Sequence, residues 1–244
     1  MKLKDETIKF MENAISTAQL VGVATLVIEP NLLRGIDEDR TVFILQDKDV
    51  PDMEFGSIGL TRLPTLTSRI KVAENLDGFS IEAKAAESDD ENDEEPFARS
   101  LTMKGKGLKV EYRCANPHQL ISARQAGPKQ MNDKMEFCVE FDDHAVEMLQ
   151  KGQAAMKAET VSVISNDGVT FELLDVNNDV FSHQFADDAV NLTGKETTKF
   201  AYRYPVKTLL LLFKHASEGL LTVSQRGIMC INVNGLNVYV LPQV

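Results

Sequence analysis

The chain has 244 residues, of which 43% are hydrophobic, and its 26 Lys and Arg against 37 Asp and Glu give a formal net charge of −11. This apolar share is ordinary for a globular protein and excludes a disordered chain. The acidic total argues against a general nucleic-acid-binding surface, although it leaves room for a local basic face. The longest notable apolar stretch, 209–213, is far shorter than the roughly 20 residues of a membrane helix.

In chain order, the first half predicts a helix, strands, a second helix and three more strands. Asp5 and Glu6 suit a first helical turn, and Ile8, Met11 and Ile15 follow the i, i+3, i+7 spacing of a buried helix face. Strand-like runs follow at 23–28 and 41–46. The second helix is predicted over 60–72, with Pro64 in its first turn. Strands are then expected at 79–83, 100–104 and 108–114.

The second half predicts the same order of elements. A helix begins within 141–148, with Val146, Leu149 and Gln153 or Met156 on its apolar face. Strands are expected at 161–164, 169–174 and 180–185, a helix at 205–216, and strands at 220–224, 228–233 and 236–241. The linker between the halves, 115–134, has little periodicity.

The two halves are related by an internal repeat, which is the most informative feature of the sequence. Pro64 and Pro205 are 141 residues apart, and so are Gly78 and Gly219. Later in each half, the offset between equivalent glycines (107 and 235) falls to 128, so the first copy holds 13 extra residues, the length of 87–99. The sequence therefore predicts a duplicated α+β fold with an acidic loop inserted in the first copy. The expected domains are 1–114 and 135–244, with 115–134 as the connecting linker.

Several segments of this repeat resemble DNA sliding clamps of the proliferating cell nuclear antigen type and the clamps of T-even-like phages. They are VSVISNDGVTF at 161–171, KFAYRY at 199–204 and NVYVLP at 237–242, and the opening MKL is closer to the phage branch. The resemblance covers essentially the whole chain. It implies a non-enzymatic homotrimer, a closed ring of six domains with helices lining the hole and antiparallel sheets outside. Such a ring would encircle duplex DNA independently of sequence, tether a replicative polymerase and be opened by an ATP-dependent clamp loader.

The interpretation as a sliding clamp predicts roles for three groups of residues. Cations on the four helices would face DNA phosphates. Taken singly, each such cation is more often an ordinary solvated residue. The predicted DNA-facing residues are Lys4, Lys9, Arg62, Arg69, Lys71, Lys151, Lys157, Lys207 and Lys214. An apolar pocket would take a partner peptide, unless its aromatic residues belong to the core; its predicted residues are Ile36, Arg40, Phe43, Leu120, Ile121, Tyr239, Leu241 and Pro242.

The third group would join one copy to the next. The last strand of the first half is expected to pair head to tail with a strand of the second half of another copy; the residues are Lys109, Val110, Glu111, Tyr112 and Arg113 against Val180, Phe181, Ser182 and His183. The alternative is that each strand is simply a shielded edge.

No catalytic signature or cofactor motif stands out. The four histidines lack a Cys/His or Ser/His setting, and the odd, widely spaced Cys114, Cys138 and Cys230 suggest neither disulfides nor zinc. We therefore expect no metal, no cofactor, no membrane and a reducing compartment, by resemblance the host-cell cytoplasm of a virus. Two other hypotheses stay open: a monomeric or dimeric clamp-fold adaptor that does not encircle DNA, and an unrelated α+β enzyme that uses the acidic loop 87–96.

Overall fold

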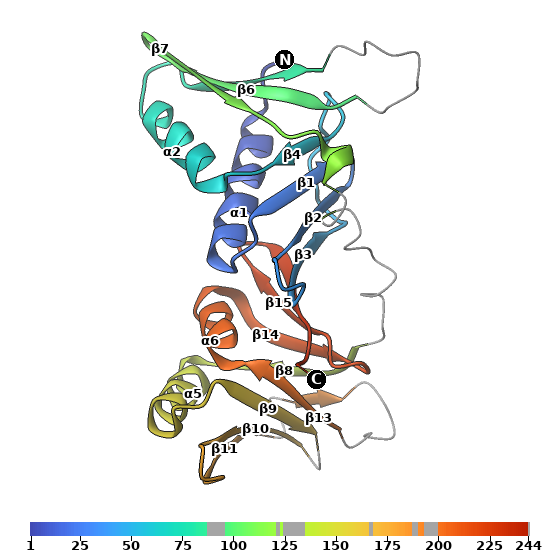
Figure 1. The fold of residues 1–244 in the computed structure, drawn as a ribbon, viewed down its shortest axis with the longest axis vertical. Helices are drawn as coiled ribbons and strands as arrows, with labels where there is room; N and C mark the ends of the chain where they lie inside the picture. The colour runs from blue at the N-terminus through green and yellow to red at the C-terminus, as the bar shows by residue number, and fades with distance from the viewer. Residues whose placement is uncertain are drawn as a thin grey trace. The chain divides into compact units, whose positions relative to one another are not determined.

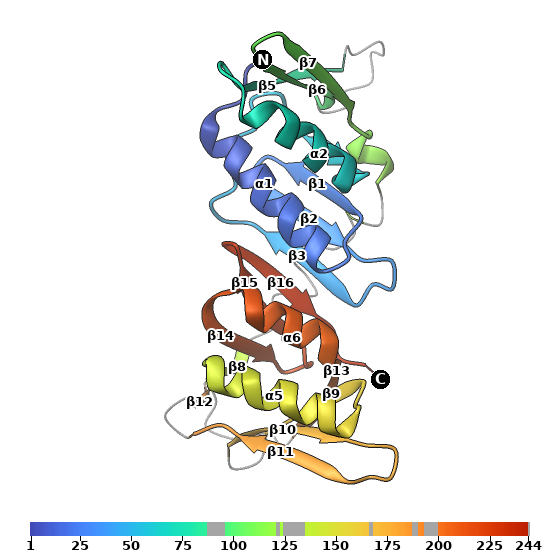
Figure 2. The same cartoon turned by 90° about the vertical axis from the view of Figure 1, so that its left-hand side faces the viewer.

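The computed structural model describes residues 1–86, 96–120, 123, 135–165, 168–186, 190–192 and 200–243. The chain divides into two compact units, Met1–Gly127 and Pro128–Val244. In each unit two helices cover one face of antiparallel strands (Figures 1 and 2). The predicted duplicated α+β fold is confirmed, whereas most of the acidic loop, Ile121 and most of the linker lie outside the described residues.

In its described residues, unit 1 has two α-helices and seven strands. In chain order these are α1 (Asp5–Leu20), β1 (Thr25–Glu29), β2 (Leu32–Ile36), β3 (Val42–Gln46), β4 (Ile58–Leu60), α2 (Leu63–Glu74), β5 (Ser80–Ala85), β6 (Ala98–Gly105) and β7 (Leu108–Arg113). Strands β3, β2, β1 and β4 lie side by side in that order, and β5, β6 and β7 form a second sheet.

The helices of unit 1 form because their apolar residues fall on one face. Ile8, Met11 and Ile15 of α1 are buried as predicted, and α2 buries Leu66 and Ile70. The predicted start of the second helix at residue 60 is wrong, because 58–60 form β4, which pairs with β1. Arg62 then adopts a left-handed conformation (φ 49°) that separates strand from helix.

Unit 2 repeats this plan. Its elements are β8 (Met135–Glu140), α5 (Asp143–Met156), β9 (Thr160–Ser165), β10 (Val169–Leu174), β11 (Val180–Gln184), β12 (Val190–Leu192), β13 (Phe200–Pro205), α6 (Val206–His215), β14 (Ala216–Ser224), β15 (Met229–Val233) and β16 (Leu236–Val240). Strands β11, β10, β9 and β13 form one sheet, and β12, β8, β14, β15 and β16 lie side by side in that order.

The apolar stripe of α5 differs from the predicted one. Its buried residues are Ala145, Leu149 and Gly152, whereas Val146 is half-buried. The reason is the neighbouring strand: a Cβ on Gly152 would lie 2.5 Å from Cδ1 of Phe181 on β11. Small residues on α5 therefore let a β11 aromatic ring pack directly against the helix.

The backbone supports the duplication position by position. Gly78 and Gly219, which follow the second helix of each unit, both have positive φ (74° and 60°). Gly107 and Gly235, in the turns before the last strand of each unit, also match (75° and 79°). Such angles favour glycine, so the glycine offsets in the sequence mark positions with equivalent backbone conformation.

Candidate functional surfaces

Five of the nine predicted DNA-facing cations are exposed lysines on the helices or at their ends. They are Lys9 on α1, Lys71 on α2, Lys157 at the end of α5, and Lys207 and Lys214 on α6. These side chains are available for long-range contact with phosphates.

The other four predicted cations have partners within their own unit. The Lys4 ammonium lies 3.4 Å from the Glu54 carboxylate, and Lys151 pairs with Glu147 one turn earlier at 2.7 Å. Exposed pairs of this kind are weak and exchange readily with solvent. Arg62 and Arg69 differ, because their guanidinium groups bind backbone atoms of β7. Their role in DNA contact stays a prediction.

Arg62 and Arg69 surround the ring of Tyr112. The Nη2 of Arg62 donates to the Arg113 carbonyl at 3.0 Å, and the Nη1 of Arg69 donates to the Glu111 carbonyl at 2.6 Å. The two guanidinium carbons lie 5.3 and 5.9 Å from the centre of the Tyr112 ring, within cation–π distance. The Tyr112 hydroxyl in turn binds the backbone of Thr61, just before α2. These contacts tie the start of α2 to β7.

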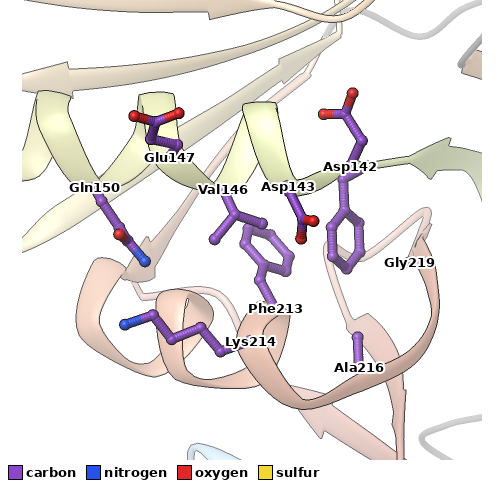
Figure 3. A pocket seen from close by; sticks show the side chains of 10 residues that line it. Asp142, Asp143, Val146, Glu147, Gln150, Phe213, Lys214, Ala216 and Gly219 are labelled. Atoms are coloured by element: carbon purple, nitrogen blue, oxygen red, sulfur yellow. The ribbon is translucent and has the colours of Figure 1, made fainter.

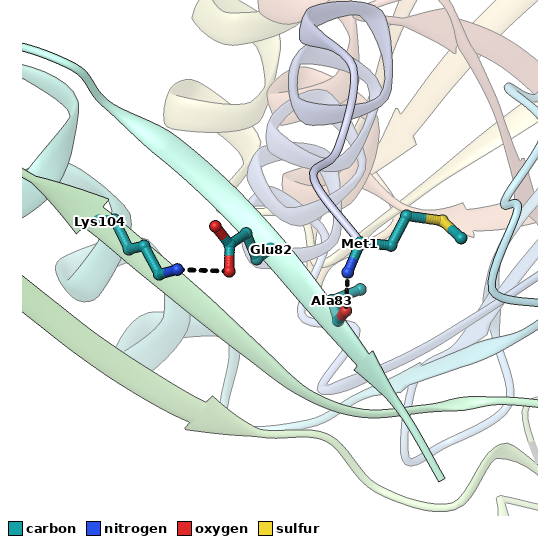
Figure 4. Close-up of polar contacts among 4 residues, drawn as sticks. All are labelled: Met1, Glu82, Ala83 and Lys104. Carbon is teal, nitrogen blue, oxygen red and sulfur yellow. Dashed lines mark hydrogen bonds and ion pairs between the residues drawn. The ribbon is translucent and has the colours of Figure 1, made fainter.

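The sheet of β5, β6 and β7 carries cations on the face opposite its buried residues. Lys104 of β6 pairs with Glu82 of β5 at 2.5 Å (Figure 4). In the strand register Lys104 lies directly across from Lys109 of β7. The amine of Met1 donates to the Ala83 carbonyl at 2.8 Å, beside β5 (Figure 4). The Lys104 ammonium holds the pKa of Glu82 below its usual range.

A groove of about 600 Å³ runs between α5 and α6 in unit 2. Val146 and the ring of Phe213 face each other between the helices, while Gln150 and Lys214 extend from the same end of the groove (Figure 3). Carboxylates line it as well, from Asp142, Asp143 and Glu147. The groove is therefore lined by carboxylates, a lysine and apolar side chains together. This mixture does not indicate one class of ligand.

A smaller groove, of about 260 Å³, lies between α1 and α2 in unit 1. Glu12 and Glu74 line it together with Lys71. Partial burial raises the pKa of Glu12, and the nearby Glu74 carboxylate raises it further. The carboxylates of Glu12 on α1 and Glu74 on α2 therefore repel each other.

Among the described residues, β11 is the end strand of the sheet that contains β10, β9 and β13. It packs on α5. Phe181 and His183 point inward, whereas Val180, Ser182 and Gln184 point outward. The ring centroids of His183 and His144 are 6.4 Å apart, and those of His183 and Phe185 are 5.1 Å apart. Burial and the neighbouring His144 lower the pKa of His183, against a smaller opposing effect of Asp142.

The hairpin between β10 and β11 carries an apolar tip that the sequence analysis missed. Leu174 and Val180 lie opposite each other across the strands, and Val176 in the turn is 97% exposed. The Asp175 carboxylate accepts from the N–H groups of Asn177 and Asp179, which holds the turn in place. The missed signal is a valine within a run of turn-forming residues, DVNND at 175–179.

The predicted peptide-pocket residues are placed as follows. Phe43 is only 5% exposed and pairs with Ile36 across β3 and β2, so it belongs to the core of unit 1. Arg40 is exposed in a turn held by the Asp37 carboxylate. Leu120 packs near Gly59 of β4, and the half-buried residues Tyr239, Leu241 and Pro242 lie in or after β16. Their joint role as a pocket stays a prediction.

Other chemistry finds little support among the described residues. None of their side chains forms a cluster of three or more His, Cys, Asp or Glu that could hold a metal, and none of the described helices is long and apolar enough to cross a membrane. The three thiols are free and half-buried. Burial raises the pKa of Cys114 to about 12 and that of Cys230 to about 11, so both are poor nucleophiles at neutral pH.

Two helices on one face of antiparallel strands, repeated within one chain, define the class as a duplicated α+β protein. No family model and no curated protein matches the sequence. Among solved structures, the chain is similar over 98% of its length to 96% of a chain in the structure described as the C-terminal region of FEN-1 bound to A. fulgidus PCNA, with 14% identity and a TM-score of 0.61. It is similar over its full length to 98% of Proliferating Cellular Nuclear Antigen from Entamoeba histolytica, with 10% identity and a TM-score of 0.60.

A bacterial structure shows the same likeness over part of its chain. The DNA polymerase sliding clamp from Caulobacter crescentus matches 98% of this chain over 64% of its own length, with 11% identity and a TM-score of 0.63. The chain thus has the DNA sliding clamp fold, as the sequence resemblance predicted. The likeness to the phage branch stays a prediction.

Proposed function

We propose that this chain is a DNA polymerase sliding clamp. Three copies would form a closed ring that encircles duplex DNA without reading its sequence, tethers the replicative polymerase and performs no chemistry itself. A ring of this kind needs an ATP-dependent loader to open it. The observation that carries the proposal is a pair of complementary strand edges, one in each unit, on a chain with the clamp fold.

The first edge is that of β7. Residues 109–113 pair with 104–100 of β6, and the N–H of Cys114 donates to the Arg99 carbonyl. Because hydrogen-bonded and non-hydrogen-bonded pairs alternate in an antiparallel ladder, the backbone groups of Lys109, Glu111 and Arg113 point away from β6. Among the described residues β7 ends its sheet, so no further strand of those residues pairs with this edge.

The second edge is that of β11. The N–H of Asp175 donates to the Asp179 carbonyl and that of Phe185 to the Val169 carbonyl, so the odd-numbered residues of β11 bond to β10. By the same alternation the backbone groups of Val180, Ser182 and Gln184 face outward. These residues also have exposed side chains, as do Lys109, Glu111 and Arg113 of β7.

The β7 edge of one copy and the β11 edge of another have outward backbone groups at matching spacing, so they could pair as neighbouring strands. Antiparallel pairing of 109, 111 and 113 with 184, 182 and 180 of another copy would place exposed side chains beside exposed ones. It would also align the inward Val110 and Tyr112 with the inward Phe181 and His183. The contact is heterologous, since two different surfaces meet, and such contacts close into rings when the rotation allows.

The experiment is mass measurement by light scattering behind a sizing column, at micromolar and nanomolar protein. We expect three times the chain mass of 27.1 kDa, and the Ser182→Pro variant should remain monomeric. Proline removes an N–H that faces outward, so it costs β11 no bond to β10. Ser182→Ala, which keeps the N–H, is the matched control. A mass of 27.1 kDa for the wild type at every concentration would contradict the ring and favour the adaptor hypothesis.

A second experiment addresses DNA. In the Lys207→Ala/Lys214→Ala variant, the slope of log affinity for duplex DNA against log salt should fall by about 2, since each phosphate contact contributes about 0.9. Lys151→Ala should change it less, because Lys151 is already paired with Glu147. Equal slopes for all three proteins would remove α6 from the DNA-facing surface.

A further inference from the structure

The free edge of β7 is already partly occupied within the chain itself. Of its three outward carbonyls, those of Glu111 and Arg113 accept hydrogen bonds from the guanidinium groups of Arg69 and Arg62. A partner strand would donate its N–H groups to the same oxygens. Strand addition and arginine capping therefore compete for the same backbone acceptors.

The caps are positioned by the local fold. Both guanidinium groups lie against the face of Tyr112, which is fully buried between the two capped residues. Arg62 also has a left-handed backbone (φ 49°), a region that non-glycine residues enter at a cost and keep only when surrounding contacts hold them. The hydrogen bond to β7 and the Tyr112 ring are such contacts.

The caps are specific to the first unit. By the offset of 141 that relates the two helices, Arg69 of α2 corresponds to Leu210 of α6, which has no donor to offer a strand edge. The equivalent of Arg62 is Arg203, which lies within β13. The duplication supplied the strand and the helix, whereas the paired arginines belong to unit 1.

We propose that Arg62 and Arg69 gate the free edge of β7. In the separate chain they cap two carbonyls, so that a stray strand finds a blocked edge, and they are displaced only by a strand that fits along the whole of β7. The proposal rests on the proposed function for the identity of that strand, β11 of a second copy. It adds that ring closure requires the two guanidinium groups to leave the edge.

The test compares self-association of the wild type with that of an Arg62→Met/Arg69→Met variant by sedimentation velocity over a concentration series. Methionine keeps an apolar side chain over Tyr112 and removes the donors. Each lost cap shifts an association equilibrium by about twofold to tenfold, so the loss of both caps should lower the concentration for half-assembly at least about fourfold. The matched control is Lys84→Met/Arg99→Met, which removes two exposed cations from the neighbouring strands β5 and β6.

The outcomes separate the gate from the ring. An unchanged or higher half-assembly concentration in the double variant overturns the gate, even where Ser182→Pro abolishes assembly and so upholds the ring. Growth of the double variant beyond three chains supports the gate and contradicts a closed trimer. If the double variant does not fold, Arg69→Met alone tests the same point, with an expected fall of at least about twofold.

Discussion

The two free strand edges of this chain belong to non-equivalent strands of the repeated units, and they differ in chemistry. Strand β7 is the last strand of unit 1, as β16 is of unit 2, whereas β11 is the third strand after the first helix of its unit, as β3 is. The edge of β7 is basic and capped, with Lys109 and Arg113 exposed and two carbonyls held by arginines. The edge of β11 is uncharged along 180–184 apart from His183 and ends in an apolar hairpin tip. The difference suits a heterologous contact, in which two unlike surfaces meet, and not the pairing of one edge with its own copy.

The largest expected effect comes from disrupting the packing of β11 on α5. Gly152→Val should destabilise the chain by about 2–3 kcal/mol, because any side chain there meets the Phe181 ring and Leu173. Urea unfolding measures the loss, and Ala155→Val on the exposed face of α5 is the control. An equal loss in both variants would attribute the effect to valine in a helix and not to β11.

A smaller effect is expected when the β7 edge loses its anchor. Tyr112→Phe removes the hydroxyl that binds the Thr61 backbone and should cost about 1–2 kcal/mol. Hydrogen exchange should rise in β7 while β11 is unchanged. Tyr202→Phe, which loses an exposed bond to the Gln225 carbonyl, should cost less. Matching losses would show that the Tyr112 hydroxyl is not a special tie between α2 and β7.

The apolar hairpin tip gives a third, smaller prediction. Val176→Ser should leave stability within about 0.5 kcal/mol, because the side chain is 97% exposed. It should weaken assembly a few-fold if the tip is covered in the ring. Val72→Ser, at a 59% exposed position on α2, is the control, and light scattering is the measurement. Unaltered assembly would leave the tip outside the subunit contact.

The mildest expected effect is a pH response confined to unit 2. Because the folded pKa of His183 is lowered by burial and by His144, the unfolded chain binds more protons as pH falls through the usual histidine range. The contribution of neutral His183 to the free energy of unfolding is therefore present above that range and is lost as pH falls through it. Asp142, which raises the pKa of His183, moderates the loss, and Glu140 and Glu218 line the same surface. His183→Gln should flatten urea-unfolding profiles between pH 7.5 and 5.5, whereas His215→Gln, at an exposed helix end, should not.

Some features of the site could be read from local sequence. The spacing of Ile8, Met11 and Ile15 placed α1, and the glycine offsets placed matching positions of positive φ, because periodicity and positive φ are local properties. Strand β2 escaped notice because LLRGI is short and interrupted by Arg34 and Gly35. A left-handed Asn31 (φ 61°) makes the tight turn that joins it to β1.

The sequence by itself determined the duplication and the fold class, from its internal repeat and the order of its predicted elements. It also determined the buried face of α1, because helical periodicity is a local property. Only the tertiary structure decided which long side chains bind which distant atoms. Arg62 and Arg69, predicted as DNA contacts, reach backbone carbonyls about half a domain away in sequence, and Lys4 meets Glu54. A flexible cation can reach many partners, and only packing brings one of them within hydrogen-bond distance.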